Sequence, residues 1–492
     1  MNFKKMIVIF TVLICIFFSI SGVVASEVNG TDITAYVNPA NDDADDGLVT
    51  YCEDDLISDS NMGTFTELQQ IINKAKPGDT ITLEKDYTYD SEFTSSIGMY
   101  IVSDLTINGN GHTLNGLSKS RILFIMANLG ENKVTLKNIT FKNGFTNSYG
   151  GAIFNLAGLT ISNCVFENNY ANIAGGAIAS VGSLNCKNSV FNKNSANGSA
   201  GAIFSLNFVN SDKYYTNGSQ DNIDERGLIS NLIMNTDIVP STDYISNCKF
   251  TNNVATARGG AVYAFSNINI VSSTFSSNKA GDVGGAVYAA KNLTIKNSKF
   301  TKNNAAMNGG AVYFRFHEIS GHYDAKGNWV SDVKFYTSVI NNCVFTENVA
   351  KNRGGAIYGF KFSEMPKVSP RLAVKCTFSD NKAPTDKNVY GGTTSNCVYK
   401  DTKLTLNTVK VKKSASKLTL TATLKKGSSP LVNKYVTFKF NGKVYKAKTN
   451  SKGVAKVNIK SNVLKKLKVG KTVIYQASYS SFSVKKTAKV YR

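Results

Sequence analysis

The middle of the chain is dominated by short segments in which apolar and polar residues alternate. Residues 293–300, Leu-Thr-Ile-Lys-Asn-Ser-Lys-Phe, show the pattern well. A period of two residues is the signature of a β-strand with one buried face. Helical periodicity is not evident between Leu105 and Asn381, so we expect this whole region to consist of strands.

These segments belong to a repeat. A Gly-Gly-Ala motif and a Phe-x-x-Asn motif recur in step, and four of the seven steps between phenylalanines from Phe141 onward are 25 residues long. The second Gly falls at Gly151, Gly176, Gly201, Gly260, Gly285, Gly310 and Gly355, with Ala200 in place of the first Gly before Gly201, and the Phe falls at Phe166, Phe191, Phe250, Phe275, Phe300, Phe345 and Phe378. A fixed period in this range predicts a solenoid whose coils stack on one another.

Each repeat predicts corners as well as strands. The pair Gly284-Gly285 permits a tight corner, and Ala-Val-Tyr after it starts a strand. Asn303 closes the next strand, because Asn tolerates the left-handed backbone conformation that a corner needs. With two or three short strands per turn, we expect an all-β, parallel β-helix.

The paired GGA[IV] and FxxN motifs resemble the polymorphic outer-membrane protein repeat, and the whole layout is similar to adhesin-like proteins of methanogenic archaea. The resemblance covers roughly residues 60 to 400, and its seven coupled copies make it more specific than one short motif. It implies a right-handed parallel β-helix of the pectin-lyase-like kind on a secreted or cell-surface protein.

The N-terminal region predicts export and a capped solenoid. Residues 1–26 have two lysines, an apolar run and small residues, as in a signal peptide, and no further transmembrane anchor is expected. Residues 27–60 read as an acidic lead-in. The capping-box pattern Thr64-Phe65-Thr66-Glu67 predicts a helix through Ile72, ending before Pro77-Gly78, that caps a β-helix over 61–400.

Three insertions interrupt the repeat at one corner. From the repeat Phe to the next second Gly the distance is ten residues in six coils in a row, from Phe166 to Gly355. From that Gly to the next Phe it is 15 residues in the short coils, but 49 after Gly201, 35 after Gly310 and 23 after Gly355. Loops stacked on one side form a binding face in many repeat proteins, although loops also accept insertions at little cost.

The insertions supply the candidate ligand-binding residues: Phe316, His317, Glu318, His322, Tyr323, Asp324 and Trp329 in the second, and Tyr214 and Tyr215 in the first. Trp329 suits a sugar ring or a protein contact, or it packs against its own loop. His317-Glu318 and His322 have a five-residue spacing that differs from the H-E-x-x-H of zinc proteases, so no metal or other cofactor is expected.

An enzyme is the alternative, because many β-helix proteins cleave acidic polysaccharides. A lyase or hydrolase of this fold needs clustered carboxylates, and the regular coils carry few acids. We therefore assign no catalytic residue, and keep a polysaccharide lyase or glycoside hydrolase as the second hypothesis.

Cysteines share a position with serines. Cys164, Cys248, Cys343 and Cys376 each lie two residues before the repeat Phe, where other coils have Ser189, Ser273 and Ser298. This exchange predicts a small, inward-facing position. Cys343 and Cys376, in successive coils, lie within reach of a disulfide, but we expect free buried thiols.

The net charge is distributed unevenly along the chain. The total of +22 comes entirely from the part after residue 400, where alternating segments and the Asn441-Gly442 turn predict a β-sandwich over 402–492, similar to bacterial immunoglobulin-like modules. The candidate polyanion-binding residues are Lys443, Lys446, Lys448, Lys465, Lys466 and Lys468. Export and the lack of a recognisable motif argue against nucleic acid as the partner.

Together these patterns predict a secreted or cell-surface adhesin-like protein. Its partners are expected to be an extracellular glycan or a surface protein of a host or neighbouring cell, bound by the insertions. A cell-wall polymer is expected to hold the basic module.

Overall fold

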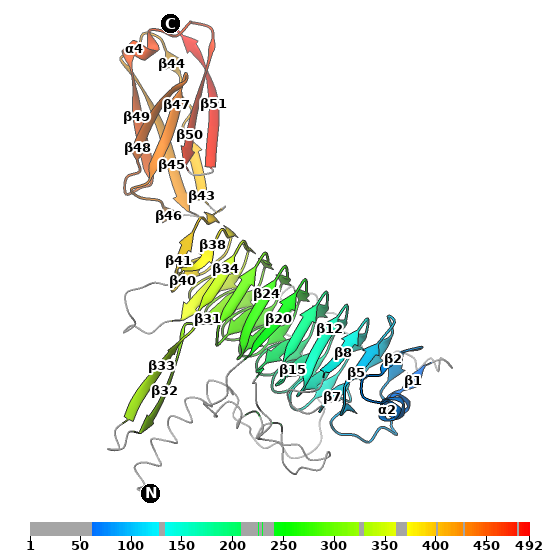
Figure 1. The fold of residues 1–492 in the computed structure, drawn as a ribbon. Coiled ribbons are helices and arrows are strands. Elements are labelled where there is room, and N and C mark those ends of the chain that lie inside the picture. Colours follow the sequence, from blue (N-terminus) through cyan, green and yellow to red (C-terminus); the bar gives the residue numbers. More distant parts are fainter. Residues whose placement is uncertain are drawn as a thin grey trace, which may run out of the picture. The chain divides into compact units, whose positions relative to one another are not determined.

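The structure is a computed structural model that describes residues 62–126, 133–207, Glu225, Ile229, 241–323, 329–360, 371–399, 402–426, 429–479 and 482–492. The expected signal peptide and acidic lead-in lie outside these residues. The chain divides into two compact units, described separately here: residues up to 292 apart from 270–272, and residues 270–272 with 293–492. Both contain coils of parallel strands, and the second also contains a β-sandwich (Figure 1).

Within the described residues the coils form four long parallel sheets, which we name after a residue type that each one stacks. The Leu sheet has 11 strands: β2 (Thr80–Thr82), β5 (Leu105–Asn108), β8 (Lys133–Lys137), β12 (Gly158–Ser162), β16 (Leu184–Lys187), β20 (Thr242–Ser246), β24 (Asn267–Val271), β28 (Leu293–Lys296), β34 (Ser338–Asn341), β38 (Arg371–Val374) and β41 (Thr393–Ser395). The Phe sheet has 12: β1 (Gly63–Thr64), β3 (Tyr87–Thr88), β6 (Thr113–Asn115), β9 (Thr140–Lys142), β13 (Val165–Glu167), β17 (Val190–Asn192), β21 (Lys249–Thr251), β25 (Thr274–Ser276), β29 (Lys299–Thr301), β35 (Val344–Thr346), β39 (Thr377–Ser379) and β42 (Val398–Tyr399).

The other two sheets are shorter. The Ala sheet has seven strands of two residues: β10 (Phe145–Thr146), β14 (Tyr170–Ala171), β18 (Ser195–Ala196), β22 (Val254–Ala255), β26 (Lys279–Ala280), β30 (Asn304–Ala305) and β36 (Val349–Ala350). The Tyr sheet has ten: β4 (Met99–Ile101), β7 (Leu123–Ile125), β11 (Ile153–Asn155), β15 (Ile178–Ser180), β19 (Ile203–Ser205), β23 (Val262–Ala264), β27 (Val287–Ala289), β31 (Val312–Arg315), β37 (Ile357–Phe360) and β40 (Val389–Tyr390).

A complete coil passes through the Leu, Phe, Ala and Tyr sheets in that order, as β12, β13, β14 and β15 do. The four all-parallel stacks confirm the expected all-β solenoid and are consistent with a right-handed parallel β-helix. The expectation of two or three strands per coil was too low. The strand of the Ala sheet is only two residues long, which is too short to show a period in the sequence.

The repeat Phe residues form the centre of the core. In the first unit Phe166, Phe191, Phe250 and Phe275 are fully buried, and successive ring centroids are 4.6–4.7 Å apart. In the second unit Phe300 and Phe345 stack at 4.9 Å. These separations match the distance between neighbouring strands, so each coil places its ring directly on that of the next.

The Asn of the Phe-x-x-Asn motif has a different role from the one expected. Asn194 lies fully buried, and its Nδ2 donates to the carbonyl oxygen of Phe166 at 3.0 Å and to Oδ1 of Asn253 at 3.0 Å. Its Oδ1 accepts from the backbone N–H of Asn169 at 3.1 Å. The motif Asn therefore joins three coils in a buried amide ladder.

The left-handed residue is the one before the motif Asn. Lys302 has φ +56°, whereas Asn303, expected to adopt this conformation, is not among the positive-φ residues of the described chain. The prediction for Asn303 was wrong because its side chain is required by backbone groups of the neighbouring coils, as the equivalent Asn194 shows. Lys302 adopts the left-handed backbone conformation that the corner needs.

The two glycines of the Gly-Gly-Ala motif suit their positions for two different reasons, although Ala200 replaces the first Gly in one coil with φ +60°. Gly259 and Gly284 have φ of +64° and +69°, in the left-handed region. Gly260 lacks this conformation, but a Cβ there would overlap the carbonyl oxygen of Gly285 in the next coil. The first Gly thus allows the turn, and the second allows the coils to approach closely.

The predicted N-terminal helix is present as α2 (Phe65–Lys74), two residues longer than expected. Its N-cap Thr64 accepts a hydrogen bond from the backbone N–H of Glu67 at 3.1 Å. Gln69 bonds both backbone groups of Tyr100 in β4, the first strand of the Tyr sheet. The helix therefore satisfies an exposed sheet edge, as a solenoid cap must.

The cysteine position is small and buried, as expected. Cys164, Cys248, Cys343 and Cys376 are at most 3% exposed, and the backbone N–H of Cys164 donates to Oγ of Ser189 in the next coil. All six cysteines of the described residues are free. Burial raises the pKa of Cys164 to about 11, so its reactive thiolate is scarce at neutral pH.

Residues 402–492 form a sandwich of two sheets. One contains β43 (Thr402–Leu406), β45 (Lys417–Lys426), β46 (Ser429–Pro430) and β49 (Val454–Lys460), and the other contains β44 (Val411–Lys412), β51 (Phe482–Tyr491), β50 (Thr472–Tyr479), β47 (Tyr435–Phe440) and β48 (Lys443–Lys448). A short helix, α4 (Ser461–Leu464), follows β49. Both residues of the Asn441-Gly442 turn have positive φ, as predicted. The likeness to immunoglobulin-like modules stays a prediction.

The structure contains no helix, within the ranges given above, that is long and apolar enough to cross a bilayer.

We predict that Asn194→Ala strongly lowers stability, because it leaves the N–H of Asn169 and the carbonyl of Phe166 buried with no side-chain partner. The expected loss is about 2–4 kcal/mol in the free energy of unfolding. Thermal and urea unfolding measure it. The control is Asn185→Ala at an exposed position of β16, and equal losses in both variants would contradict the ladder's role.

Candidate functional site

The three insertions leave the solenoid at the same corner, as predicted. They follow β19, β31 and β37, which are all strands of the Tyr sheet, and they precede β20, β34 and β38, which are all strands of the Leu sheet. The corner between these two sheets is therefore where the repeat admits extra residues.

The second insertion is a β-hairpin of β32 (His317–Tyr323) and β33 (Trp329–Phe335), drawn as two long arrows in Figure 1. The strands are antiparallel, and the register places Tyr323 opposite Trp329 and His317 opposite Phe335. The sequence marked this segment as an insertion rich in aromatic and titratable residues, but it did not show the hairpin. Glu318, His322, Tyr323 and Trp329 lie on its strands, while Asp324 lies outside the described residues.

Phe316 and His317 hold the base of the hairpin. Phe316 is 4% exposed and lies edge-on to Phe314 at 4.8 Å, while His317 is 1% exposed and stacks on Phe360 at 5.9 Å. Burial, and then the charge of Arg315, lowers the pKa of His317. The assignment of these two residues to ligand contact was wrong, because their side chains are occupied by the coil.

The second strand of the hairpin exposes apolar side chains. Val330, Val333 and Phe335 are 38%, 46% and 58% exposed. Exposed apolar residues on one projecting element are typical of a recognition surface. Sequence reasoning missed Val333 and Phe335, although their alternation with Trp329 was visible in the chain.

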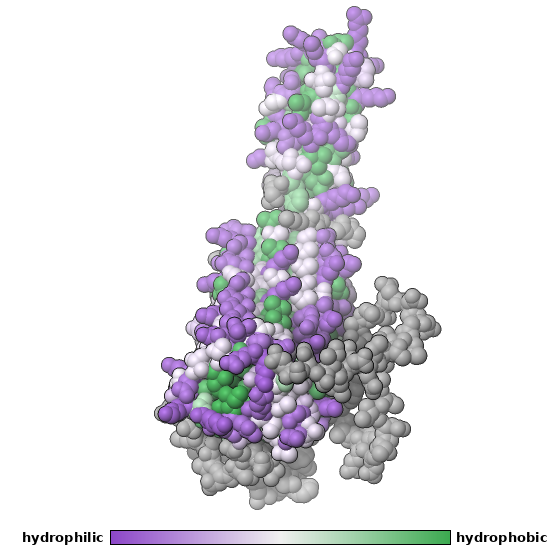
Figure 2. All heavy atoms as spheres, turned by 90° about the vertical axis from the view of Figure 1, so that its right-hand side faces the viewer, coloured by the Kyte–Doolittle hydropathy of each residue, from purple (hydrophilic) through white to green (hydrophobic). Residues whose placement is uncertain are grey.

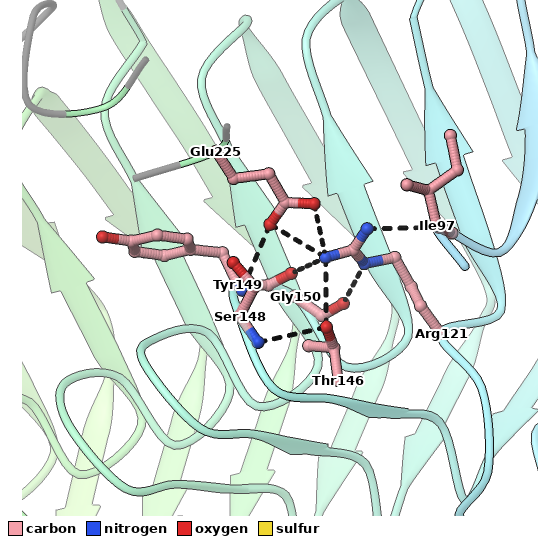
Figure 3. A network of polar contacts seen from close by, with 7 residues as sticks. All are labelled: Ile97, Arg121, Thr146, Ser148, Tyr149, Gly150 and Glu225. Carbon is pink, nitrogen blue, oxygen red and sulfur yellow. Dashed lines mark hydrogen bonds and ion pairs between the residues drawn. The ribbon is translucent and has the colours of Figure 1, made fainter. Parts of the chain in front are cut away.

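The first insertion is tied to the coils at two points. Tyr214 and Tyr215 lie outside the described residues, but Glu225 and Ile229 of the same insertion are 7% and 2% exposed. Glu225 forms an ion pair with Arg121 at 2.8 Å, across 104 residues of sequence (Figure 3). Such a distant pair gives no signal in the sequence.

Arg121 is the centre of a buried polar network. Its guanidinium donates to the carbonyl oxygens of Ile97, Tyr149 and Gly150, and to Oγ1 of Thr146 (Figure 3). It also lies over the rings of Phe124 and Phe154, at 5.6 and 5.4 Å from their centroids. Burial lowers the pKa of Arg121, and the charge of Glu225 opposes that shift. Glu225 therefore neutralises a cation that would otherwise be isolated from water.

Ile229 packs on aromatic residues of the Tyr sheet. It lines a small apolar hollow with Tyr149, Phe204, Tyr263 and Phe265. The rings of Phe204 and Tyr263 are 5.4 Å apart, and those of Tyr263 and Tyr288 are 4.6 Å apart. Part of the first insertion thus covers this ladder of rings.

A buried carboxylate lies at the base of the first insertion. Asp243 is 0% exposed and takes the place in β20 that Leu184 has in β16. It accepts hydrogen bonds from Asn207 at 2.6 Å, from the backbone N–H of Leu184 at 2.8 Å, and from the hydroxyls of Ser205 and Ser266. Burial raises its pKa to about 6, and these hydrogen bonds limit the rise. Asn207 and Asp243 stand on either side of the insertion, so their contact closes its base.

The six candidate lysines of the sandwich are all exposed but do not form one cluster. Lys446 and Lys448 lie on the outer face of β48. Lys443 lies on the other face of the strand, the one from which Tyr445 and Ala447 pack against the core. Lys465, Lys466 and Lys468 follow α4. Because a spacing of three residues reverses the side of a strand, Lys443 does not share a face of β48 with Lys446 and Lys448.

Among the described residues, no group of three or more His, Cys, Asp or Glu side chains is placed to hold a metal ion.

We predict that Glu225→Gln weakens the attachment of the first insertion, because it leaves the buried charge of Arg121 without a counter-ion. Limited proteolysis within residues 208–240 is expected to become at least about tenfold faster, in line with the cost of breaking a buried pair. The control is Glu347→Gln, whose partner Lys302 is exposed and 3.9 Å away. Unchanged cleavage would show that the pair does not hold the insertion.

A second prediction concerns pH. Because the pKa of Asp243 is raised to about 6, the folded chain binds this proton more tightly than the unfolded chain. Its stabilising contribution is complete below about pH 4 and is lost as pH rises through about 6, a change of about 3 kcal/mol. Asp243→Asn is expected to remove this pH dependence from thermal unfolding, while Asp380→Asn, at an exposed position, keeps it. The same slope in Asp243→Asn and the wild type would contradict the prediction.

Comparison with known proteins identifies the repeat. Residues 247–264, 272–290 and 342–359 match the Chlamydia polymorphic membrane protein repeat. Each segment contains one Phe-x-x-Asn and one Gly-Gly-Ala motif, and runs from the Phe sheet to the Tyr sheet. No curated protein matches the chain.

Proposed function

We propose that this chain is a surface-exposed, adhesin-like protein that binds glycan or protein ligands through the insertions at the corner between the Tyr and Leu sheets. Its basic module holds the protein at the cell wall. The repeat match and the parallel β-helix support a surface location, because the matched repeat is named for membrane proteins.

The observation that carries the proposal is the hairpin β32–β33. Its base is fixed by buried Phe316 and His317, while Val330, Val333 and Phe335 remain open to solvent. A rigid scaffold that presents exposed apolar groups on one element is the usual arrangement of a binding site on a repeat protein. Trp329 belongs to the same strand and is the strongest single candidate for ligand contact.

Charge supports attachment through the module. The residues after 401 carry lysines and no acid, so an anionic wall polymer is their natural counterpart. Purple, hydrophilic side chains cover much of the module of β43–β51 in Figure 2.

The enzymatic alternative has less support. Asp243, the one carboxylate of the described residues with a markedly raised pKa, is enclosed in the core and cannot reach a polymer. We therefore propose binding without catalysis.

Glycan-array and cell-surface binding test the proposal. Trp329→Ala and Phe335→Ala are expected to fold normally and to weaken ligand binding about tenfold, the usual effect of removing a central aromatic contact. The matched control is Tyr244→Ala, since Tyr244 is a 50% exposed aromatic residue on β20 and does not belong to the hairpin.

Unchanged binding in both hairpin variants would remove the hairpin as the site. New reducing ends or unsaturated sugars released from an acidic polysaccharide would instead establish the enzyme.

A further inference from the structure

The sandwich carries charge that it cannot neutralise. Residues 402–492 contain 22 lysines and Arg492, with no aspartate or glutamate. No side-chain carboxylate within the module is available to pair with them, so the relief of their mutual repulsion must come from outside the module, from ions or from an anionic partner.

One face of the module arranges lysines in successive cross-strand rows. On the outer side of β48–β47–β50–β51, one row contains Lys446, Thr437, Ser478 and Ser483, and the next contains Val444, Lys439, Gln476 and Lys485. Lys448 lies one row beyond the first of these, and Lys489 lies further along β51. The lysines thus follow a diagonal from β48 through β47 to β51, with hydroxyl and amide groups between them and no lysine on β50.

The same face exposes apolar and aromatic side chains. Tyr435, Val444, Ile474 and Tyr491 are 60%, 54%, 48% and 52% exposed, and all four share the outward parity of the lysines. Nζ of Lys448 lies 5.0 Å from the centroid of the Tyr435 ring. We call this surface, with its lysines, the Lys-Tyr face.

The opposite sheet gives an internal comparison. Its outer side, on β43, β45 and β49, carries Lys403, Lys425, Lys456 and Lys460 with threonines between them. None of the exposed large hydrophobic residues described in the module lies there. The two faces are therefore alike in charge, and differ in the rings and aliphatic groups beside that charge.

We propose that the Lys-Tyr face binds an acidic polysaccharide, which lies along the diagonal of lysines; this rests on the proposed attachment through the module. Lysines pair with the acidic groups, the hydroxyl and amide side chains meet sugar hydroxyls, and Tyr435 and Tyr491 offer apolar surfaces to sugar rings. The ten residues of β51 make the face about 30 Å long, enough for several sugars.

A single-stranded nucleic acid fits this face less well. Its bases need a succession of aromatic platforms along the groove. The two tyrosines lie at opposite ends of the face, one beginning β47 and the other ending β51. The surface between them consists of lysines, hydroxyls, amides and the aliphatic side chains of Val444 and Ile474, with no aromatic ring.

The test compares two variants of the whole chain that have the same net charge. The first changes Lys439, Lys446, Lys448 and Lys485 to Gln, and the second changes Lys403, Lys425, Lys456 and Lys460 to Gln. Binding to polygalacturonate is measured at several salt concentrations, with neutral dextran and an oligonucleotide of matched charge as further probes. Thermal unfolding establishes that both variants fold.

The first variant is expected to lose at least about tenfold in affinity for polygalacturonate at moderate salt, and the second less than about threefold. Tyr435→Ala is expected to weaken binding severalfold, with an unchanged salt slope, because it removes no charge.

Equal losses in the two lysine variants would overturn the proposal, since net charge alone would then explain binding. Tighter binding to the oligonucleotide, or no binding to polygalacturonate at low salt, would overturn it too. Retention on isolated cell walls distinguishes a failure of the Lys-Tyr face from a failure of the proposed attachment through the module. Salt-sensitive retention that survives in the first variant would sink the Lys-Tyr face alone, whereas a wild-type chain that is never retained would sink the attachment itself.

Discussion

The buried hydrogen bonds between successive coils are the constraint on which the β-helix depends. A parallel coil cannot fold alone, because each strand leaves its backbone groups to the coil above and below. The Asn ladder extends this dependence to side chains, as Asn194 bonds Phe166 in the previous coil and Asn253 in the next. Phenylalanine stacking at 4.7 Å holds the same spacing from within the core. A substitution that changes this spacing therefore disturbs the contacts of three coils at once.

The ligand site that we propose on the β-helix lies where this constraint is relaxed. The corner after the Tyr sheet accepts additional residues because the strands on either side keep their register, and all three long insertions occur there. The insertions differ in character. The hairpin exposes apolar groups from a buried base, whereas the first insertion sends Glu225 and Ile229 back into the coils. The corner therefore tolerates an insertion whether or not that insertion exposes residues that could bind a ligand.

The sandwich follows a different physical rule. Its core of Leu420, Phe438 and Tyr475 is ordinary, but its surface carries a single sign of charge. Repulsion among lysines costs stability, so a module that retains them gains from an anionic surrounding. The aromatic and aliphatic residues distinguish one sheet face from the other, although both have similar charge.

The sequence by itself determined the repeat, the β-helix, the corner of the insertions, the N-terminal cap and the separation of charge, because these depend on residues at a regular local spacing. Some details failed for the same reason. Asn303 was assigned to a corner because its partners belong to other coils and leave no local signal. Phe316 and His317 were assigned to ligand binding because their burial at the hairpin base depends on Phe314 and Phe360. Only the tertiary structure decided that Arg121 meets Glu225, that Asp243 is enclosed by side chains of several coils, and which lysines share a face. Such contacts join residues by coil stacking and strand register, and no local pattern encodes them.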